Sequence, residues 1–180
     1  MQVARLAARL VIGGLFFGHG TQKLMGWFGG PGLSGTDQMM GSLQLHPPRR
    51  NAVAAGVTEA GGGALLAAGL ATPLAASGLI GVMTTAIRKV HAPKGVWNAN
   101  GGYEYNLVLI AALLALAEAG PGKWSLDRAF GIERTGTRWA LASGALGVAA
   151  SFATTELGRR AAEREAVQQP PHGPSAERAI

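Results

Sequence analysis

The sequence predicts an all-α fold, in which four helices form a polytopic membrane bundle and a fifth helix follows near the C-terminus. Charged residues make up only 14% of the 180-residue chain, against roughly a quarter in an ordinary soluble domain. The charges are also segregated: residues 10–22, 105–117 and 139–155 carry none, and residues 51–87 carry only Glu59. A helix of a soluble protein keeps one polar face, so charge should recur along it. Its absence on every side predicts helices that lipid tails surround.

Four segments are each close to the length that crosses a bilayer, which is about 20 mostly apolar residues. They cover residues 6–25, 51–70, 73–90 and 103–119. A tight link ends at Pro73, a residue that suits the start of a helix. The run Gly-Pro-Gly after residue 119 ends the fourth segment. Strands are not expected, because β-branched residues are sparse and two-residue alternation is missing.

A fifth segment, residues 139–157, is only mildly apolar, because alanine, serine and threonine dominate it. We predict that it spans the membrane, with an interfacial amphipathic helix as the alternative. The predicted organisation is a four-helix membrane domain over residues 1–130, this additional helix within residues 131–157, and a charged, mobile tail over residues 158–180. The first segment is expected to be retained, because no small-residue cleavage site follows its apolar stretch.

Two short surface helices are expected in the loops. Thr36 is placed to cap one of them in the first loop, and Ser125 is placed to cap another before Leu126. Trp27 and Phe28 suit the boundary between membrane and water.

Small residues recur at a spacing of four within the apolar segments. Gly14 and Gly18 form one such pair, and Ser143, Gly147 and Ser151 form a longer series. This spacing allows helix backbones to approach closely, although it also arises by chance in an alanine-rich chain, so both interpretations stay open.

Several classes of function are excluded or disfavoured. The chain has no cysteine, which excludes zinc fingers and thiolate iron–sulfur sites formed by this chain. Residues 30–35 match the dinucleotide pattern G-x-G-x-x-G, but no strand precedes them, so we interpret them as a glycine-rich turn. The net charge of +6 comes from basic residues at segment ends and in the tail, which suits anionic lipid headgroups rather than nucleic acid.

Titratable residues of both signs converge at one end of an antiparallel bundle of these segments. They are His19, Lys23, Glu59, Arg88, His91 and Glu104. A carboxylate inside a membrane is costly unless it is paired, so Glu59 is expected to face inward with His19, Lys23 or His91 as its partner. An inter-helix clamp and a ligand-binding site both fit this cluster. No metal site is predicted, because the spacing lacks a compact signature such as Glu-x-x-His.

Arg9 lies near the opposite end of the first segment, where we expect it to snorkel towards the headgroups. Lysines and arginines outside the tail divide equally between the two ends, so the tail decides the orientation. A spanning fifth helix would place the tail at the end that holds Lys23, and that end would be cytoplasmic.

These residues resemble the DoxX family of bacterial integral membrane proteins over residues 5–130. The matching motifs are Arg9-Leu10-Val11-Ile12-Gly13, His19-Gly20 with Lys23-Leu24, Gly26-Trp27-Phe28-Gly29-Gly30, Glu59-Ala60-Gly61-Gly62, Gly69-Leu70-Ala71-Thr72-Pro73, His91-Ala92-Pro93-Lys94-Gly95, Gly102-Tyr103-Glu104-Tyr105 and Trp124-Ser125-Leu126-Asp127. The resemblance implies a four-helix, multi-pass protein of the bacterial plasma membrane with a loose link to redox and sulfur metabolism. Some relatives are subunits of a thiosulfate:quinone oxidoreductase, and mycobacterial-type relatives are described as the membrane partner of a superoxide dismutase and a sulfurtransferase. The fifth helix and the tail lie outside the family pattern.

Three functions of different classes are compatible with the sequence. The first is a membrane subunit of a redox or sulfur-handling assembly, with redox enzymes as protein partners and a quinone exchanging protons with the polar cluster. The second is a small-molecule or proton-coupled permease with Glu59 as its proton site. The third is a membrane scaffold without a ligand. The sequence shows no complete catalytic or redox-cofactor ligand set, and it leaves the substrate, the partners and the oligomeric state open.

Overall fold

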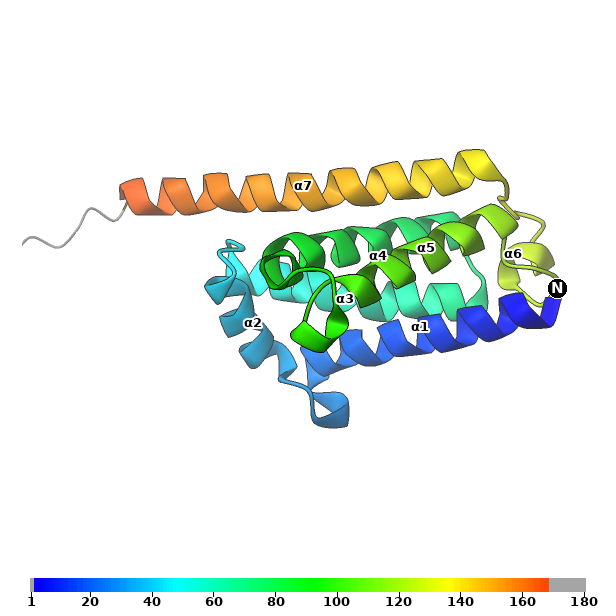
Figure 1. Cartoon of the computed structure of the whole chain (residues 1–180), viewed down its shortest axis with the longest axis horizontal. Helices are drawn as coiled ribbons and strands as arrows, with labels where there is room; N and C mark the ends of the chain where they lie inside the picture. The colour runs from blue at the N-terminus through cyan, green and yellow to red at the C-terminus, as the bar shows by residue number, and fades with distance from the viewer. Residues whose placement is uncertain (1, 169–180) are drawn as a thin grey trace, which may run out of the picture.

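The computed structural model describes residues 2–168, and within them the chain is helical without strands. Four antiparallel helices form the bundle: α1 (Gln2–Met25), α3 (Pro48–Ala68), α4 (Thr72–Ala86) and α5 (Glu104–Ala119). The long helix α7 (Thr137–Gln168) packs along α4 and α5 on one side of the bundle (Figure 1). The all-α prediction with five long helices is therefore confirmed.

Shorter elements cover the two ends of the bundle. They are η1 (Trp27–Gly29), α2 (Gly32–Ser42), the π-helical segment η2 (Ile87–His91), η3 (Ala92–Lys94), η4 (Asn98–Asn100) and α6 (Leu126–Ala129). The predicted cap of α6 is confirmed, because the Ser125 hydroxyl accepts a hydrogen bond of 3.2 Å from the Arg128 N–H. Thr36 was expected to be a cap, but it lies inside α2, and its hydroxyl donates to the Lys23 carbonyl at 3.1 Å. This hydroxyl ties α2 to the end of α1.

Glycines allow α1 and α3 to pack backbone against backbone. A Cβ atom at Gly20 would lie 2.2 Å from the Ala60 nitrogen, and one at Gly63 would lie 2.5 Å from the Gly13 carbonyl oxygen. For Gly14 and Gly18, whose spacing left both interpretations open, the structure shows no packing role within the chain, because both have open space where a Cβ would stand. The two glycines lie on a part of α1 that does not contact α3, unlike Gly13 and Gly20.

The predicted small-residue series on α7 is confirmed as its contact with α4. The buried Ser143 hydroxyl donates to the Pro73 carbonyl at 2.9 Å. A Cβ at Gly147 would lie 2.7 Å from the Ser77 carbonyl oxygen, and Ser151 is buried beside Thr85, whose hydroxyl oxygen lies 2.9 Å from its own. The fifth helix therefore packs through the face that holds these three residues.

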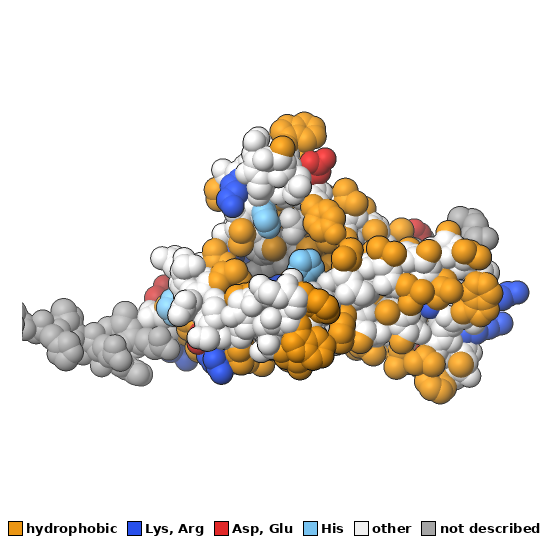
Figure 2. Space-filling view, turned by 90° about the horizontal axis from the view of Figure 1, so that it is seen from below, with side chains coloured by type: hydrophobic (Ala, Val, Ile, Leu, Met, Phe, Trp, Pro, Cys, Tyr) orange, Lys and Arg blue, Asp and Glu red, His pale blue; other side chains and the backbone are white. Residues whose placement is uncertain are grey.

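The bundle combines buried polar side chains with exposed large apolar ones. Arg9, Glu59, Asn106 and Asp127 are buried. Large apolar side chains are exposed along the outside, including Leu10, Val11, Phe17, Leu107, Val108, Leu141, Leu146 and Phe152. Figure 2 shows hydrophobic side chains over much of the visible face of the bundle.

Among the described residues, one helical stretch is long and apolar enough to cross a membrane, and it is Thr137–Arg164 of α7. Helices α4 and α5 have 15 and 16 residues, slightly below the length of a typical span. However, α4 continues directly into η2, so the chain stays helical from Thr72 to His91. The predicted crossing by all four bundle helices therefore stays a prediction.

Arg9 was expected to snorkel, and this expectation was wrong. Its side chain is 1% exposed, and its guanidinium donates to the carbonyls of Pro121 and Trp124 at 2.5 and 2.7 Å. The nearby Asp127 carboxylate, also 1% exposed, accepts from the N–H groups of Ala71 and Thr72 at 2.8 and 3.1 Å. The loop after α5 folds back over this end, so Arg9 finds backbone partners there instead of headgroups.

The C-terminal helix is longer than the sequence predicted. We expected the helix to end at Leu157, whereas α7 continues to Gln168. Its last turns are held by pairs such as Glu156 with Arg160, at 2.7 Å and a spacing of four residues. Residues 158–168 of the predicted tail are therefore helical, and residues 169–180 lie outside the described residues.

Candidate functional site

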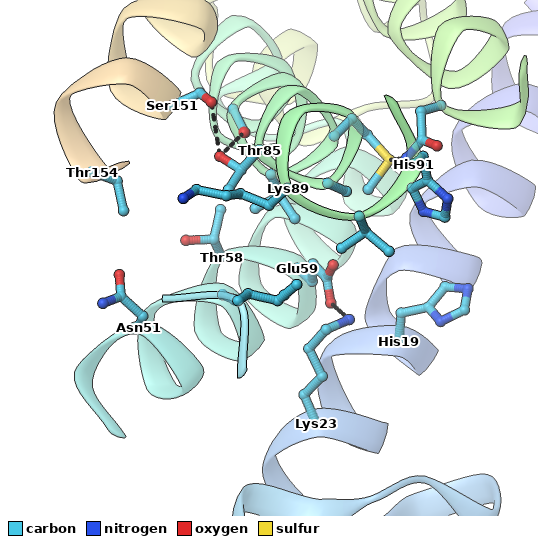
Figure 3. Close-up of a pocket in the computed structure, with 18 of the residues that line it drawn as sticks. His19, Lys23, Asn51, Thr58, Glu59, Thr85, Lys89, His91, Ser151 and Thr154 are labelled. Atoms are coloured by element: carbon cyan, nitrogen blue, oxygen red, sulfur yellow. Dashed lines mark hydrogen bonds and ion pairs between the residues drawn. The ribbon is translucent and has the colours of Figure 1, made fainter. Parts of the chain in front are cut away.

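A cavity of about 540 Å³ lies at the end of the bundle that holds α2 (Figure 3). Its volume falls within the range of about 300–1,000 Å³ typical of small-molecule sites. Helices α1 to α5 and α7 contribute to its wall. The apolar part includes Phe16, Met40, Leu45, Val82 and Leu109. The cavity is thus mostly apolar, with a few polar groups placed along its wall.

Besides Met39 of α2 and Asn98 of η4, the exposed wall residues of the cavity form two groups. On one side, the exposed wall residues are Leu15, His19 and Tyr105, from α1 and α5; we call this side the α1–α5 mouth. On the other side they are Ala54, Ala150 and Thr154, from α3 and α7; we call this side the α3–α7 mouth. The helices beside each mouth carry exposed apolar side chains, such as Leu10 on α1, Val57 on α3, Leu107 on α5 and Leu146 on α7.

An ion pair between Lys23 and Glu59 joins α1 to α3 in the wall of the cavity. The Lys23 Nζ lies 2.5 Å from the Glu59 Oε2. The Glu59 side chain is 3% exposed and the Lys23 side chain 20%, so the carboxylate is the more deeply buried partner. Of the three partners that the sequence allowed for Glu59, the structure selects Lys23.

Two histidines add groups that can exchange protons. His91 Nδ1 lies 2.7 Å from the Gly101 carbonyl oxygen. A carbonyl only accepts, so this nitrogen carries the proton and leaves Nε2 as an acceptor when the ring is neutral. His19 Nδ1 lies 3.0 Å from the Gln22 Oε1, and His19 stands at the α1–α5 mouth.

Arg88 and Glu104 were predicted to belong to this cluster, but neither lines the cavity. The Arg88 side chain points towards α7, where its guanidinium donates a hydrogen bond of 3.2 Å to the Ser151 hydroxyl. The central carbon of the guanidinium lies 3.7 Å from the centre of the Phe152 ring. Glu104 accepts a hydrogen bond of 3.0 Å from the Asn98 N–H. Arg88 therefore joins two helices and Glu104 closes a loop, whereas His19, Lys23, Glu59 and His91 share the cavity.

Four further polar residues of the wall were not predicted from the sequence to belong to a site. Lys89 was counted only as a basic residue at a helix end, and it lines the cavity on its α7 side. Asn106 is buried, and its amide donates to the Met83 sulfur at 3.3 Å. Asn106 is the one amide side chain in the uncharged residues 105–117, and this pattern could have identified it as a buried polar residue. Ser151 and Thr154 line the cavity because α7 packs there, which no local pattern indicates.

Residues 2–168 contain no group of three histidine or acidic side chains close enough to hold a metal ion. The charged groups of the cavity wall are Lys23, Glu59 and Lys89. With neutral histidines, these give the cavity one net positive charge. The arrangement can bind a mostly apolar molecule, donate hydrogen bonds to its polar end and exchange protons with it.

Comparison with known proteins gives one match. Residues 4–92 match the model of the DoxX family. No curated protein and no solved structure matches the chain. The matched segment contains α1 to α4, and with them His19, Lys23, Glu59 and His91, whereas α5 and α7 follow it. The predicted resemblance is therefore confirmed over this segment, and through residues 4–92 the chain belongs to the DoxX family.

Proposed function

We propose that the chain is a multi-pass protein of the bacterial plasma membrane. The supporting observation is the combination of exposed apolar side chains on α1, α5 and α7 with buried charges inside the bundle. In water, such an arrangement would expose apolar area at a high free-energy cost. In lipid, the same surface meets acyl chains, and the buried charges are paired or hydrogen-bonded internally.

We further propose that the cavity binds a quinone, and that the chain serves as the membrane subunit of a redox assembly. The observation that carries this proposal is the mostly apolar cavity with the Lys23–Glu59 pair in its wall. A lipophilic ring could enter from the bilayer through the α1–α5 mouth. Its carbonyl oxygens are acceptors. The Lys23 ammonium can donate to them, and His19 can donate when its ring is protonated, because its Nδ1 proton is held by the Gln22 Oε1.

Reduction of a quinone to a quinol consumes two electrons and two protons. In this proposal a redox enzyme partner supplies the electrons. The chain's own residues position the ring and transfer protons, with His19 at the mouth and Glu59 behind the lysine. A histidine suits this role because its ordinary pKa lies near neutral pH.

Binding of a quinone can be tested on the full chain in nanodiscs of zwitterionic lipid. Decylubiquinone should raise the unfolding temperature, because a ligand at about 100 times its Kd stabilises the folded state by about 2.7 kcal/mol. Ala86→Phe places a ring inside the cavity, since Ala86 lines it, and should abolish the shift. Ala111→Phe is the matched control, because Ala111 is exposed on α5 and is not part of the wall.

Three results would distinguish the alternatives. No shift in the wild type, together with no redox enzyme recovered in mild detergent, would contradict the proposal. A Glu59→Gln variant that folds, keeps quinone binding and loses the uptake of a solute would favour a proton-coupled permease instead. If the Glu59→Gln variant loses stability while quinone binding and solute uptake stay unchanged, the result would favour a membrane scaffold without a ligand.

A further inference from the structure

The α3–α7 mouth holds a positive charge that the Lys23–Glu59 pair does not neutralise. Lys89 lines the cavity there, and Figure 3 shows its ammonium pointing into the space between Asn51, Thr58 and Thr154. Among the side chains that the structure describes, no carboxylate lies within 4.0 Å of it, in contrast to Lys23. Glu59, the one acidic residue in the described wall, is already paired with Lys23.

The hydroxyl side chains of Thr58 on α3 and Thr154 on α7 lie on the same side of the cavity as this ammonium (Figure 3). The Ser151 hydroxyl lies 2.9 Å from the Thr85 hydroxyl and accepts a hydrogen bond of 3.2 Å from Arg88. Ser151 lines the cavity, but its own proton is engaged with Thr85, because the single Thr85 proton also has the Gly81 carbonyl oxygen as an acceptor at 2.9 Å. The Arg88 guanidinium behind it adds a second positive charge near the same wall. The α3–α7 mouth therefore offers donors and positive charge to a group that accepts hydrogen bonds.

We propose that the α3–α7 mouth binds the anionic head group of an amphipathic molecule, with Lys89 as its counter-ion and the apolar body lying in the cavity. A carboxylate or a phosphate could accept from the Lys89 ammonium and the Thr154 hydroxyl together, since both line this part of the cavity. An apolar body fits the rest of the cavity, which is lined by side chains such as Met40 and Leu45. This site does not depend on a quinone at the α1–α5 mouth, so the two proposals can fail separately.

Helix α7 is essential to this site, although it lies outside the segment that matches the family. It supplies Ala150, Ser151 and Thr154 to the wall. Without α7, Lys89 would face the lipid or the solvent with no enclosing partner. The additional helix thus converts a lysine at a helix end into part of an enclosed subsite.

The test uses the full chain in nanodiscs of phosphatidylcholine, and native mass spectrometry to measure bound decanoate, decyl phosphate and decanol. These probes share the apolar chain and differ in the head group. At least one of the two anions should bind about tenfold more tightly than decanol, which is the effect of one charge-assisted hydrogen bond. Whichever anion binds more tightly identifies the head group as a carboxylate or a phosphate. Equal binding of all three probes would overturn the proposal.

Variants locate the site. Lys89→Met keeps the length of the side chain and should remove the preference for the anion while leaving decanol unaffected, and Lys89→Arg should retain it. Thr154→Val should weaken anion binding without changing the net charge, which covers the case in which Lys89→Met fails to fold. Lys94→Met is the control, because Lys94 is exposed and lies outside the cavity. Unchanged anion binding in Lys89→Met, or an equal loss in Lys94→Met, would contradict the assignment.

A membrane lipid could be the natural source of the head group. Adding phosphatidylglycerol to the nanodiscs should then displace the bound anion from the wild type. If it does not, the site selects a free, single-chain amphiphile instead. Either result keeps the anionic head group at Lys89 and identifies its origin.

Discussion

Lys23 on α1 and Glu59 on α3 form an ion pair of 2.5 Å in which the carboxylate is almost fully buried and the ammonium is partly exposed. The two ends of this pair are therefore not equivalent. Removing Glu59 leaves a lysine that can reach a polar environment. Removing Lys23 leaves a buried carboxylate without its counter-ion.

This asymmetry predicts the order of two substitutions. Lys23→Met should destabilise the chain by about 3–5 kcal/mol, the cost of leaving a buried charge unpaired, and Glu59→Gln should cost less. The measurement is denaturant unfolding in detergent micelles. The double variant Lys23→Met/Glu59→Gln should be more stable than Lys23→Met alone, because it leaves no buried charge. A Glu59→Gln variant that is less stable than Lys23→Met would contradict the argument.

The glycine contacts between α1 and α3 give a second prediction. Gly20→Ala should be severely destabilising, since its methyl group would stand 2.2 Å from the Ala60 nitrogen, which belongs to the backbone and cannot move aside. Gly14→Ala is the matched control on the same helix, because nothing lies within 4 Å of its Cβ position. It should be neutral or stabilising by up to about 1 kcal/mol, the difference in helix propensity between the two residues. Thermal unfolding of both variants in the same detergent tests this, and equal losses would show that α1 does not approach α3 as closely as described.

The buried Asp127 gives a third prediction. Its carboxylate accepts three hydrogen bonds, from the N–H groups of Ala71 and Thr72 and from the Thr72 hydroxyl at 3.0 Å. Asp127→Asn replaces one oxygen by a donor and should cost about 1–3 kcal/mol, the range for leaving a buried group unsatisfied. Asp37→Asn is the control, since Asp37 is partly exposed and lies 3.9 Å from Arg49. Chemical denaturation should separate the two variants clearly, and similar midpoints for both would refute the structural role of Asp127.

The sequence predicted those features that depend on a single physical property, such as the absence of charge along a segment or the cost of burying a carboxylate. Uncharged runs located the five long helices, because an apolar stretch of this length has few alternatives to a helix surrounded by lipid or by other helices. The burial cost of Glu59 likewise required a counter-ion, and the register of antiparallel neighbours reduced the candidates to His19, Lys23 and His91.

Features that depend on how helices rotate against one another could not be predicted. Arg88 and Lys89 are neighbours in sequence, yet Arg88 contacts α7 and Lys89 lines the cavity. Their directions depend on the π-helical turn η2 and on the packing of α7. Arg9 could not be placed either, because its partners are backbone carbonyls of a loop more than 100 residues away and no local pattern indicates them.

The orientation of α7 gives the final prediction. Figure 1 shows α7 running from the end that holds α6 to the end that holds α2. Its last turns bring Arg159, Arg160 and Arg164 to the α2 end. If α7 crosses the membrane, the α2 end has more lysines and arginines than the opposite end. This excess should hold the α2 end in the cytoplasm.

Because the natural chain has no cysteine, single exposed residues can be replaced and labelled in intact cells with a membrane-impermeant maleimide. Lys123→Cys, between α5 and α6, should react from outside. Lys94→Cys and Arg164→Cys should react only after the cells are opened, since both belong to the α2 end. Reaction of Lys123→Cys and Arg164→Cys from the same side would show that α7 does not cross. If Lys94→Cys and Arg164→Cys react in intact cells and Lys123→Cys does not, α7 still crosses the membrane, but in the opposite orientation. The basic residues of α7 would then not determine the topology.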